Sequence, residues 1–490
     1  YRRQRQMCIR DSPLNTDLKV AVMGPNANDS VMQWGNYNGI PGHTVTLLEA
    51  VRSKLPEGQV MYEPGCDRTS REALQSLFSE CSINGKPGFS AEYWNNRICE
   101  GEVVATDQIS TPFHFATTGA TTFAPGVEIT NFSARYESVF RPSQSGDVAF
   151  RFQLDGEVTL MLDGKQVAQK VYVKNPTSLY TLQAKAGKEY HIEILFKQRN
   201  ERATLDFDLG KQVEINLNLA VEKVKDADVV LFAGGISPSL EGEEMPVEVP
   251  GFKGGDRTDI ELPAVQRDLL KALKKAGKKV VFINYSGSAI GLVPESNTCE
   301  AILQGWYPGQ AGGTAIVDVL FGDYNPAGRL PVTFYKDAGQ LPDFEDYSMK
   351  GRTYRYMQQQ PLFPFGHGLS YTTFTYGEAD LSKNTIGDGG TVTLTIPVSN
   401  AGQRDGDEVV QVYLRCMADK EGPHYTLRAF KRVHIPAGET KQVTIPLTYE
   451  SFEWFDTATN TVHPLKGTYE LLYGGSSDKN KLKTIVMNVQ

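Results

Sequence analysis

Two blocks that alternate short apolar strands with helices flank a long stretch of a different pattern. In the first block, LKVAVMG from Leu18 and QVMYEPG predict strands on either side of the helical pattern HTVTLLEAVRSKL. In the second, VVLFAGG, KKVVFINYSG and CEAILQG predict strands, with helices predicted at NLAVEKVKDAD, about 263–275 and QAGGTAIVDVLFG. This alternation is typical of a parallel sheet with helices on both faces. We therefore expect one α/β domain, residues 13–84 and 214–340, divided by an insertion.

The insertion, residues 85–213, is predicted to be an all-β domain. Its short runs alternate polar and apolar residues and are broken by Gly, Pro, Asn and Asp, as in SARYESVFRP and EYHIEILFKQ. Two Asp-Gly pairs, beginning at Asp155 and Asp163, predict hairpin turns between strands. Just before the insertion, the pattern of SREALQSLFSEC at 70–81 predicts a helix.

The last third of the chain contains two further parts. Residues 341–370 are rich in Pro, Tyr and Phe without a period, which predicts an extended connecting arm. From 371 to 490 the strands return, as GTVTLTIPVSN, EVVQVYLRC and GTYELLYGG, with the spacing of an immunoglobulin-sized β-sandwich. The predicted fold class is a multidomain protein that combines α/β and all-β parts.

Composition and motifs exclude several classes of function. The formal net charge is -8 and there is no basic stripe with interleaved aromatic residues, so we expect no nucleic-acid partner. No apolar run approaches the roughly 20 residues of a membrane span. The six cysteines lie far apart and no H-E-x-x-H occurs, so neither a metal site nor a disulfide framework is expected. The turns GPNAND and AGGISP match no phosphate loop, which disfavours a nucleotide cofactor.

Residues 1–12, YRRQRQMCIRDS, are basic and lack apolar periodicity. The segment RQMCIRDS resembles translated sequencing-adapter sequence, and we therefore leave residues 1–12 out of the fold prediction. On this interpretation the natural protein continues upstream, and any signal peptide lies outside the sequence.

An acidic loop follows the predicted strand 229–233. It places Glu241, Glu243 and Glu244 within four residues and continues through several Gly and Pro residues to Pro263. Loops at the carboxyl ends of strands carry the binding groups of open α/β sheets. The alternative is a solvated acidic surface without a specific role.

Several segments together resemble one family across nearly the whole chain. They include KVAVMGPNAND, WGNYNGIPGHTVTLLEAV, DVVLFAGGISPSLEGEE, GGDRTDIELPAVQRDLL, GWYPGQAGGTAIVDVLFGDYNPAGRLPVTF and PFGHGLSYTTF. The chain resembles the C-terminal part of glycoside hydrolase family 3, the β-glucosidase and β-xylosidase family. The resemblance implies an α/β sandwich followed by a fibronectin type III-like domain. FSAEYWNN and FRPSQSGDVAFRFQLDGEVTLMLDGKQV make the insertion similar to the protective-antigen-type domain of some members, which can shape the substrate pocket.

The resemblance also assigns candidate site residues. The family's acidic motif E-x-E-G implies that Glu243 is the catalytic acid/base, with Glu241 as the alternative because Glu244 stands where the motif often has Gly. The pair Asp256 and Arg257 would bind substrate or position the loop. Trp34 and Tyr37, on the loop after the first strand, would stack on a sugar ring.

Two departures from the family pattern limit what this chain could do. The family's N-terminal (β/α)8 barrel, which supplies the aspartate nucleophile, has no counterpart here, and Ala311 stands where the family usually has Glu. An acid/base on one domain and a nucleophile on another imply that neither half is active alone.

The resemblance implies a fragment of a retaining, exo-acting β-glycosidase that needs no cofactor. Its partners would be a glycoside or oligosaccharide substrate, the missing N-terminal barrel and a second copy in a homodimer, in the periplasm or outside a bacterial cell. Glucose and xylose both remain open as the released sugar. The alternative from another class is a non-catalytic carbohydrate-binding or adhesion protein.

Overall fold

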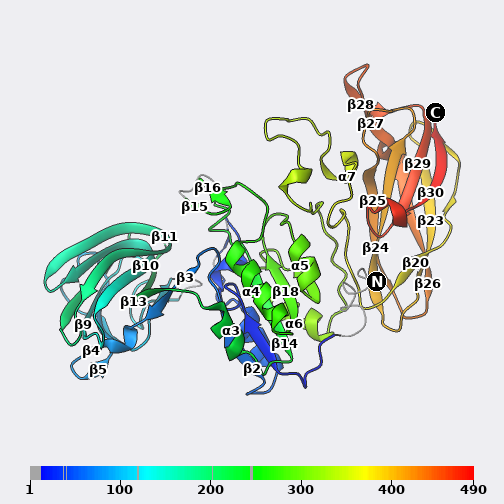
Figure 1. The fold of residues 1–490 in the computed structure, drawn as a ribbon. Helices are drawn as coiled ribbons and strands as arrows, with labels where there is room; N and C mark the ends of the chain where they lie inside the picture. Colours follow the sequence, from blue (N-terminus) through cyan, green and yellow to red (C-terminus); the bar gives the residue numbers. More distant parts are fainter. Residues whose placement is uncertain (1–12, 37, 40, 118–120, 201, 243–246) are drawn as a thin grey trace.

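The computed structural model describes residues 13–490 apart from 37, 40, 118–120, 201 and 243–246. Three bodies follow one another across Figure 1: an all-β body, a central α/β body and a C-terminal β-sandwich. The chain passes from the central body into the all-β body and back again before it reaches the sandwich.

The central body is built on a five-stranded parallel sheet in the order β19-β18-β14-β1-β2. β14 is buried along its whole length, because both faces of a parallel sheet are covered by helices. The strands and their flanking helices are β1 (Val20–Met23), η2 (Val31–Trp34), α2 (Leu47–Lys54), β2 (Val60–Glu63), α3 (Leu217–Lys223), β14 (Val229–Gly235), α4 (Ala264–Lys275), β18 (Lys279–Tyr285), α5 (Val293–Thr298), β19 (Ala301–Gln304) and α6 (Gly312–Phe321).

A separate apolar cluster covers each face of this sheet. Leu269 and Leu273 of α4 pack with Phe232 and Phe282 on one face. On the other face, residues of α2 and α6 pack against the alternate residues of the same strands, including Leu231. Every strand and helix predicted for the α/β blocks at 18–63 and 217–321 is present within a few residues, and α5 is an additional short helix.

The all-β body is an eleven-stranded antiparallel assembly around an aromatic core. Phe89, Phe113 and Phe207 lie within van der Waals contact of one another, with ring centroids between 5.2 and 5.7 Å apart. Its strands are β3 (Glu72–Ser76), β4 (Cys81–Ile83), β5 (Lys86–Pro87), β6 (Phe89–Trp94), β7 (Ala105–Ile109), β8 (Phe113–Ala116), β9 (Ser133–Phe140), β10 (Gly146–Leu162), β11 (Lys165–Ala184), β12 (Tyr190–Lys197) and β13 (Thr204–Glu214), and η3 spans Phe78–Glu80.

The helix predicted at 70–81 is wrong. Glu72–Ser76 is strand β3, which pairs antiparallel with β13 from Glu72 and Glu214 to Ser76 and Gly210. Backbone hydrogen bonds to a strand far along the chain outweigh the local helical preference. Phe78 then lies in the aromatic core. The antiparallel sheet therefore begins before the expected boundary at 85.

One of the two predicted hairpin turns is also wrong. Asp163 and Gly164 have positive φ and join β10 to β11 in a tight turn, as predicted. At Asp155, by contrast, β10 continues without a turn, and the ladder to β11 shifts register between Asp155 and Val158. Gly156 serves close packing there, because a Cβ would lie 2.5 Å from the Phe196 ring.

The C-terminal body is a two-sheet β-sandwich. The alternating burial of β23 places its apolar side chains, such as Leu394 and Ile396, between the two sheets. Its elements are β20 (Phe374–Tyr376), β21 (Asp380–Leu381), β22 (Thr385–Ile386), β23 (Thr391–Asn400), β24 (Gly406–Cys416), β25 (Thr426–Ile435), β26 (Thr440–Thr448), η5 (Tyr449–Phe452), β27 (Glu453–Asp456), β28 (Thr461–Pro464), β29 (Gly467–Gly474), η6 (Lys479–Lys481) and β30 (Lys483–Val489).

An arm connects the central body to the sandwich, with η4 (Ala338–Gln340) just before it and the short helix α7 (Thr353–Tyr356) within it (Figure 1). A buried ion pair fixes the junction: Arg329 lies 2.7 Å from Glu408 of β24, and both side chains are almost fully buried. Backbone bonds between Leu330 and both Gly366 and His367 attach the end of the arm beside this pair.

Candidate active site

The loops that leave the carboxyl ends of β1, β14, β18 and β19 meet at one edge of the parallel sheet, because all four strands run in the same direction. β1 has β2 on one side and β14 on the other, so the chain order changes direction between β1 and β14. Crevices at such switch points are the usual binding sites of open α/β sheets.

The switch point itself is filled by a structural network. The side-chain amide of the buried Asn26, after β1, donates to the carbonyl oxygens of Gly234 and Ile236 at 3.1 Å. Arg68 donates to Asn26 at 2.8 Å and pairs with Asp29. These groups are committed to one another and fix the loops after β1 and β14 relative to each other.

Glu241, on the loop after β14, is the centre of the polar site. Its carboxylate accepts three hydrogen bonds: from the Gly287 backbone N–H at 2.9 Å, from the Ser288 hydroxyl and from the Tyr307 hydroxyl at 2.5 Å. Gly287 and Ser288 follow β18, and Tyr307 follows β19. A single half-buried side chain thus joins the loops of three neighbouring strands.

Arg257 makes a second attachment between the same loops. Its guanidinium donates to the Ser288 hydroxyl at 3.2 Å and to the Ala289 carbonyl at 3.3 Å. It also donates to the carbonyls of Asp259 at 3.0 Å and Glu261 at 3.4 Å, on its own side of the loop. Burial lowers the pKa of Arg257, whereas the nearby Glu241 carboxylate acts in the opposite direction.

Tyr307 stays protonated and donates a hydrogen bond to Glu241. Burial, with the Glu241 carboxylate as the second cause, raises the pKa of Tyr307 above its ordinary value. The preceding residue, Trp306, has φ of 55°, a region that non-glycine residues rarely occupy. This conformation directs the chain after β19 so that Tyr307 turns toward the carboxylate.

The structure brings together only part of the predicted site. Glu241 and Arg257 both contact Ser288. Asp256 is an exposed residue of the small sheet formed by β15 (Glu248–Val249), β16 (Phe252–Lys253) and β17 (Asp256–Arg257). Trp34 is half-buried and donates from its indole nitrogen to Thr44 at 2.7 Å, on its own loop. Glu243 and Tyr37 lie outside the described residues.

Sequence analysis did not identify Gly287, Ser288 or Tyr307 as site residues. Gly287 and Ser288 lie where the predicted strand KKVVFINYSG ends, and Tyr307 lies in GWYPG, which enters only through the resemblance. Both segments follow predicted parallel strands directly, as the acidic loop does. That shared position was the available signal, because the carboxyl ends of parallel strands meet at one edge.

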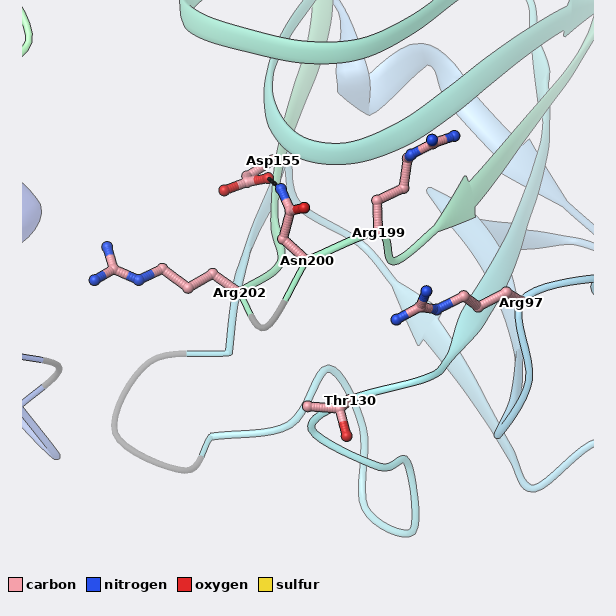
Figure 2. Close-up of a pocket in the computed structure, with 6 residues that line it drawn as sticks. All are labelled: Arg97, Thr130, Asp155, Arg199, Asn200 and Arg202. Carbon is pink, nitrogen blue, oxygen red and sulfur yellow. Dashed lines mark hydrogen bonds between the residues drawn. The ribbon is translucent and has the colours of Figure 1, made fainter.

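The all-β body carries a polar hollow of about 570 Å³. Figure 2 shows Arg97 directed into it and Asn200 donating to Asp155, at 2.9 Å. Arg199 pairs with Glu157 at 2.8 Å, and Arg202 donates to the backbone oxygen of Asn38 at 3.4 Å. Asn38 belongs to the loop after η2, so the rim of the hollow touches the carboxyl edge of the parallel sheet.

Among the described residues, no three His, Cys, Asp or Glu side chains are arranged to hold a metal ion. In the same part of the chain, every helix is too short or too polar to cross a membrane.

Fold and site together define a class of protein: a parallel α/β domain with an anchored carboxylate on its carboxyl-edge loops, followed by a β-sandwich. Residues 12–371 match the glycosyl hydrolase family 3 C-terminal domain, and residues 408–477 match a fibronectin type III-like domain. The chain belongs to glycosyl hydrolase family 3.

Two curated relatives illustrate the similarity. A xylan 1,4-beta-xylosidase of Xylanibacter ruminicola is 46% identical over 475 residues, which cover 96% of this chain and 54% of the relative. A periplasmic beta-glucosidase of Salmonella typhimurium is 38% identical over 250 residues, 48% of this chain and 31% of the relative. The chain thus spans about half or less of the length of these relatives.

A solved structure has the same fold. The beta-glucosidase from Kluyveromyces marxianus superposes over 98% of this chain and 60% of its own, with a TM-score of 0.67 at 23% identity. The superposition covers all three bodies, including the insertion.

Proposed function

We propose that this chain is the acid/base-bearing part of a retaining, exo-acting β-glycosidase that releases terminal β-linked xylose or glucose from the non-reducing end of a glycoside. The observation that carries the proposal is the 46% identity, across 96% of the chain, to a relative named a xylan 1,4-beta-xylosidase. That relative favours xylose, and the beta-glucosidase from Salmonella typhimurium keeps glucose as the alternative.

Retaining glycosidases use two carboxyl groups roughly 5 to 5.5 Å apart, one as nucleophile and one as acid/base. We assign the acid/base to Glu243, two residues after the anchored Glu241. It would protonate the leaving oxygen in the first step and remove a proton from water in the second. Asp256 and Arg257 would hold the loop, and Trp34 and Tyr37 would contact the sugar.

The nucleophile would come from outside these 490 residues. We propose that an N-terminal barrel supplies it, as the family resemblance implies, and the chain spans 54% of the relative from Xylanibacter ruminicola. Without that second carboxylate the chain would be inactive alone.

The all-β body would act as a protective-antigen-type domain at the mouth of this site. Its support is the bond from Arg202 to Asn38, which links the rim of the hollow to the loop that carries Trp34. A periplasmic location is proposed from the name of the relative from Salmonella typhimurium.

The test is the hydrolysis of aryl β-xylosides and aryl β-glucosides. We expect no hydrolysis by this chain alone, and hydrolysis when the N-terminal part of the Xylanibacter ruminicola relative is joined upstream of residue 13. Activity of the chain alone would require a nucleophile within its own residues and would contradict the division of the site. An inactive but folded fusion would contradict the proposed function.

A further inference from the structure

We propose that Glu241 is a positioning residue: its carboxylate anchors the acidic loop to the loops after β18 and β19, and it does not itself exchange a proton with substrate. The catalytic part of this inference rests on the proposed function. The anchoring itself rests on contacts within the chain and can be tested without any activity.

The groups around Glu241 direct their protons at its carboxylate. The Gly287 N–H can only donate, so the oxygen that it contacts must accept. The same oxygen also takes the Tyr307 bond. A general acid must instead point an O–H at the leaving group. Protonation of this oxygen would leave it one lone pair for the Gly287 N–H and would require the Tyr307 hydroxyl to turn and accept, so the observed bonds favour an acceptor here.

The other carboxylate oxygen of Glu241 is also an acceptor. It accepts from the Ser288 hydroxyl, whose own oxygen accepts from Arg257 at 3.2 Å. The guanidinium occupies the acceptor side of the hydroxyl, and the serine proton is therefore directed at Glu241. Together with the Gly287 and Tyr307 bonds to the first oxygen, this chain gives both oxygens of Glu241 fixed partners.

The acidic loop is fixed to one short segment at two points. Glu241 attaches its start to Gly287 and Ser288, and Arg257 attaches its end to Ser288 and Ala289. The described residues between Glu241 and Arg257 are therefore held relative to the β18 loop from both sides.

Gly287 lies directly against the Glu241 carboxylate. A Cβ built on Gly287 would lie 2.9 Å from the Glu241 oxygen and 3.0 Å from the Tyr307 ring. Its φ lies outside the left-handed region, so the backbone conformation does not require glycine. The Glu241 carboxylate requires glycine here, because it occupies the space that a Cβ would fill. Gly287 is therefore part of the anchor.

Amide hydrogen exchange of the 490-residue chain tests the anchor directly. In Glu241→Ala, exchange in β15–β17 should accelerate at least about tenfold, because the variant removes charge-assisted bonds. Glu241→Gln can still accept from Gly287 and Tyr307, so its acceleration should stay below about threefold. Gly287→Ala should act like Glu241→Ala, and Tyr307→Phe should have an intermediate effect.

Glu248→Ala is the matched control, because Glu248 is an exposed carboxylate on the same loop. It should leave exchange in β16 and β17 unchanged, and β14 should exchange at the wild-type rate in every folded variant. Unchanged exchange in both Glu241→Ala and Tyr307→Phe would overturn the anchor.

Kinetics of the fusion described above test the catalytic part. Glu241→Gln should keep kcat/KM within about tenfold of wild type and retain the basic limb of the pH–rate profile, whereas Glu241→Ala should lose about a hundredfold. Glu243→Gln should lose the basic limb and form glycosyl azide when azide is added. The same azide product from Glu241→Gln, with loss of the basic limb, would make Glu241 the acid/base and overturn the proposal. An inactive wild-type fusion would refute the proposed function, whereas the exchange data would still decide the anchor.

Discussion

The all-β body and the carboxyl edge of the parallel sheet are held together by different forces. The all-β body has an aromatic core in which Phe113 contacts several other rings. The carboxyl edge is joined by polar contacts between loops, with Glu241 and Arg257 at its centre. Apolar burial stabilises a body as a whole, whereas these hydrogen bonds fix the position of one segment. We therefore expect substitutions in the first region to affect global stability and those in the second to affect local order and activity.

The largest expected effect is in the aromatic core. Phe113→Ala should destabilise the all-β body by about 3–5 kcal/mol, because it removes a fully buried ring and leaves a cavity. The change in the free energy of unfolding would be measured by denaturant unfolding, and hydrogen exchange in β9 and β12 would locate it in the all-β body. Phe344→Ala is the control, since Phe344 is 91% exposed and its loss should change stability by less than about 0.5 kcal/mol. Similar effects of the two variants would contradict the aromatic-core explanation.

Two ion pairs near the junction with the sandwich allow a test of whether burial determines the free energy lost when one charged partner is removed. Arg329→Met should destabilise the junction by about 3–4 kcal/mol, because it leaves the buried Glu408 carboxylate unpaired. Asp407→Asn, in the neighbouring pair with the exposed Arg432, should cost less than about 1 kcal/mol. Thermal unfolding of the two variants in one buffer gives the comparison. Equal losses would show that exposure does not separate these ion pairs.

At the carboxyl edge, Arg257→Lys should have a smaller and local effect. The guanidinium reaches one hydroxyl and three carbonyl oxygens, which a lysine ammonium cannot reach together. We expect a loss of about 1–2 kcal/mol in the protection of β15–β17 and no change in β14. Hydrogen exchange measures both segments in one experiment. A matching loss in β14 would make Arg257 a residue of global stability and weaken the contrast between the two regions.

The smallest expected effect is a pH dependence in the all-β body. The hydrogen bond from His114 to Asp206 raises the pKa of His114 above its ordinary value of 6.5. Its contribution is therefore fully present below pH 6.5 and is lost as the pH rises through the higher folded-state pKa. Because this pair is exposed, the loss should be a few tenths of a kcal/mol. Chemical unfolding at pH 5.5 and 8 should detect it in wild type and not in His114→Gln.

The fold could be predicted where burial directly determines the pattern of apolar residues. VVLFAGG and KKVVFINYSG became β14 and β18, because strands buried on both faces read as continuous apolar runs. The segment at 70–81 failed because its strand depends on β13, far along the chain. The partners of Glu241 could not be derived from spacing, since they depend on the order of strands in the sheet. The role of Glu243 stays a prediction.

The pairing of β3 with β13 has a consequence for how the chain folds. β1 and β14 are neighbours in the sheet although they lie far apart along the chain, with Val20 paired to Val229. Closing so long a loop is entropically costly. Once Glu72 and Glu214 are paired, however, the chain leaves and re-enters the central body at almost the same point. The folded inserted body then holds its two connecting strands together and shortens the effective path along the chain from β1 to β14. We therefore expect the all-β body to fold first, with the parallel sheet completed only after its two connecting strands have met.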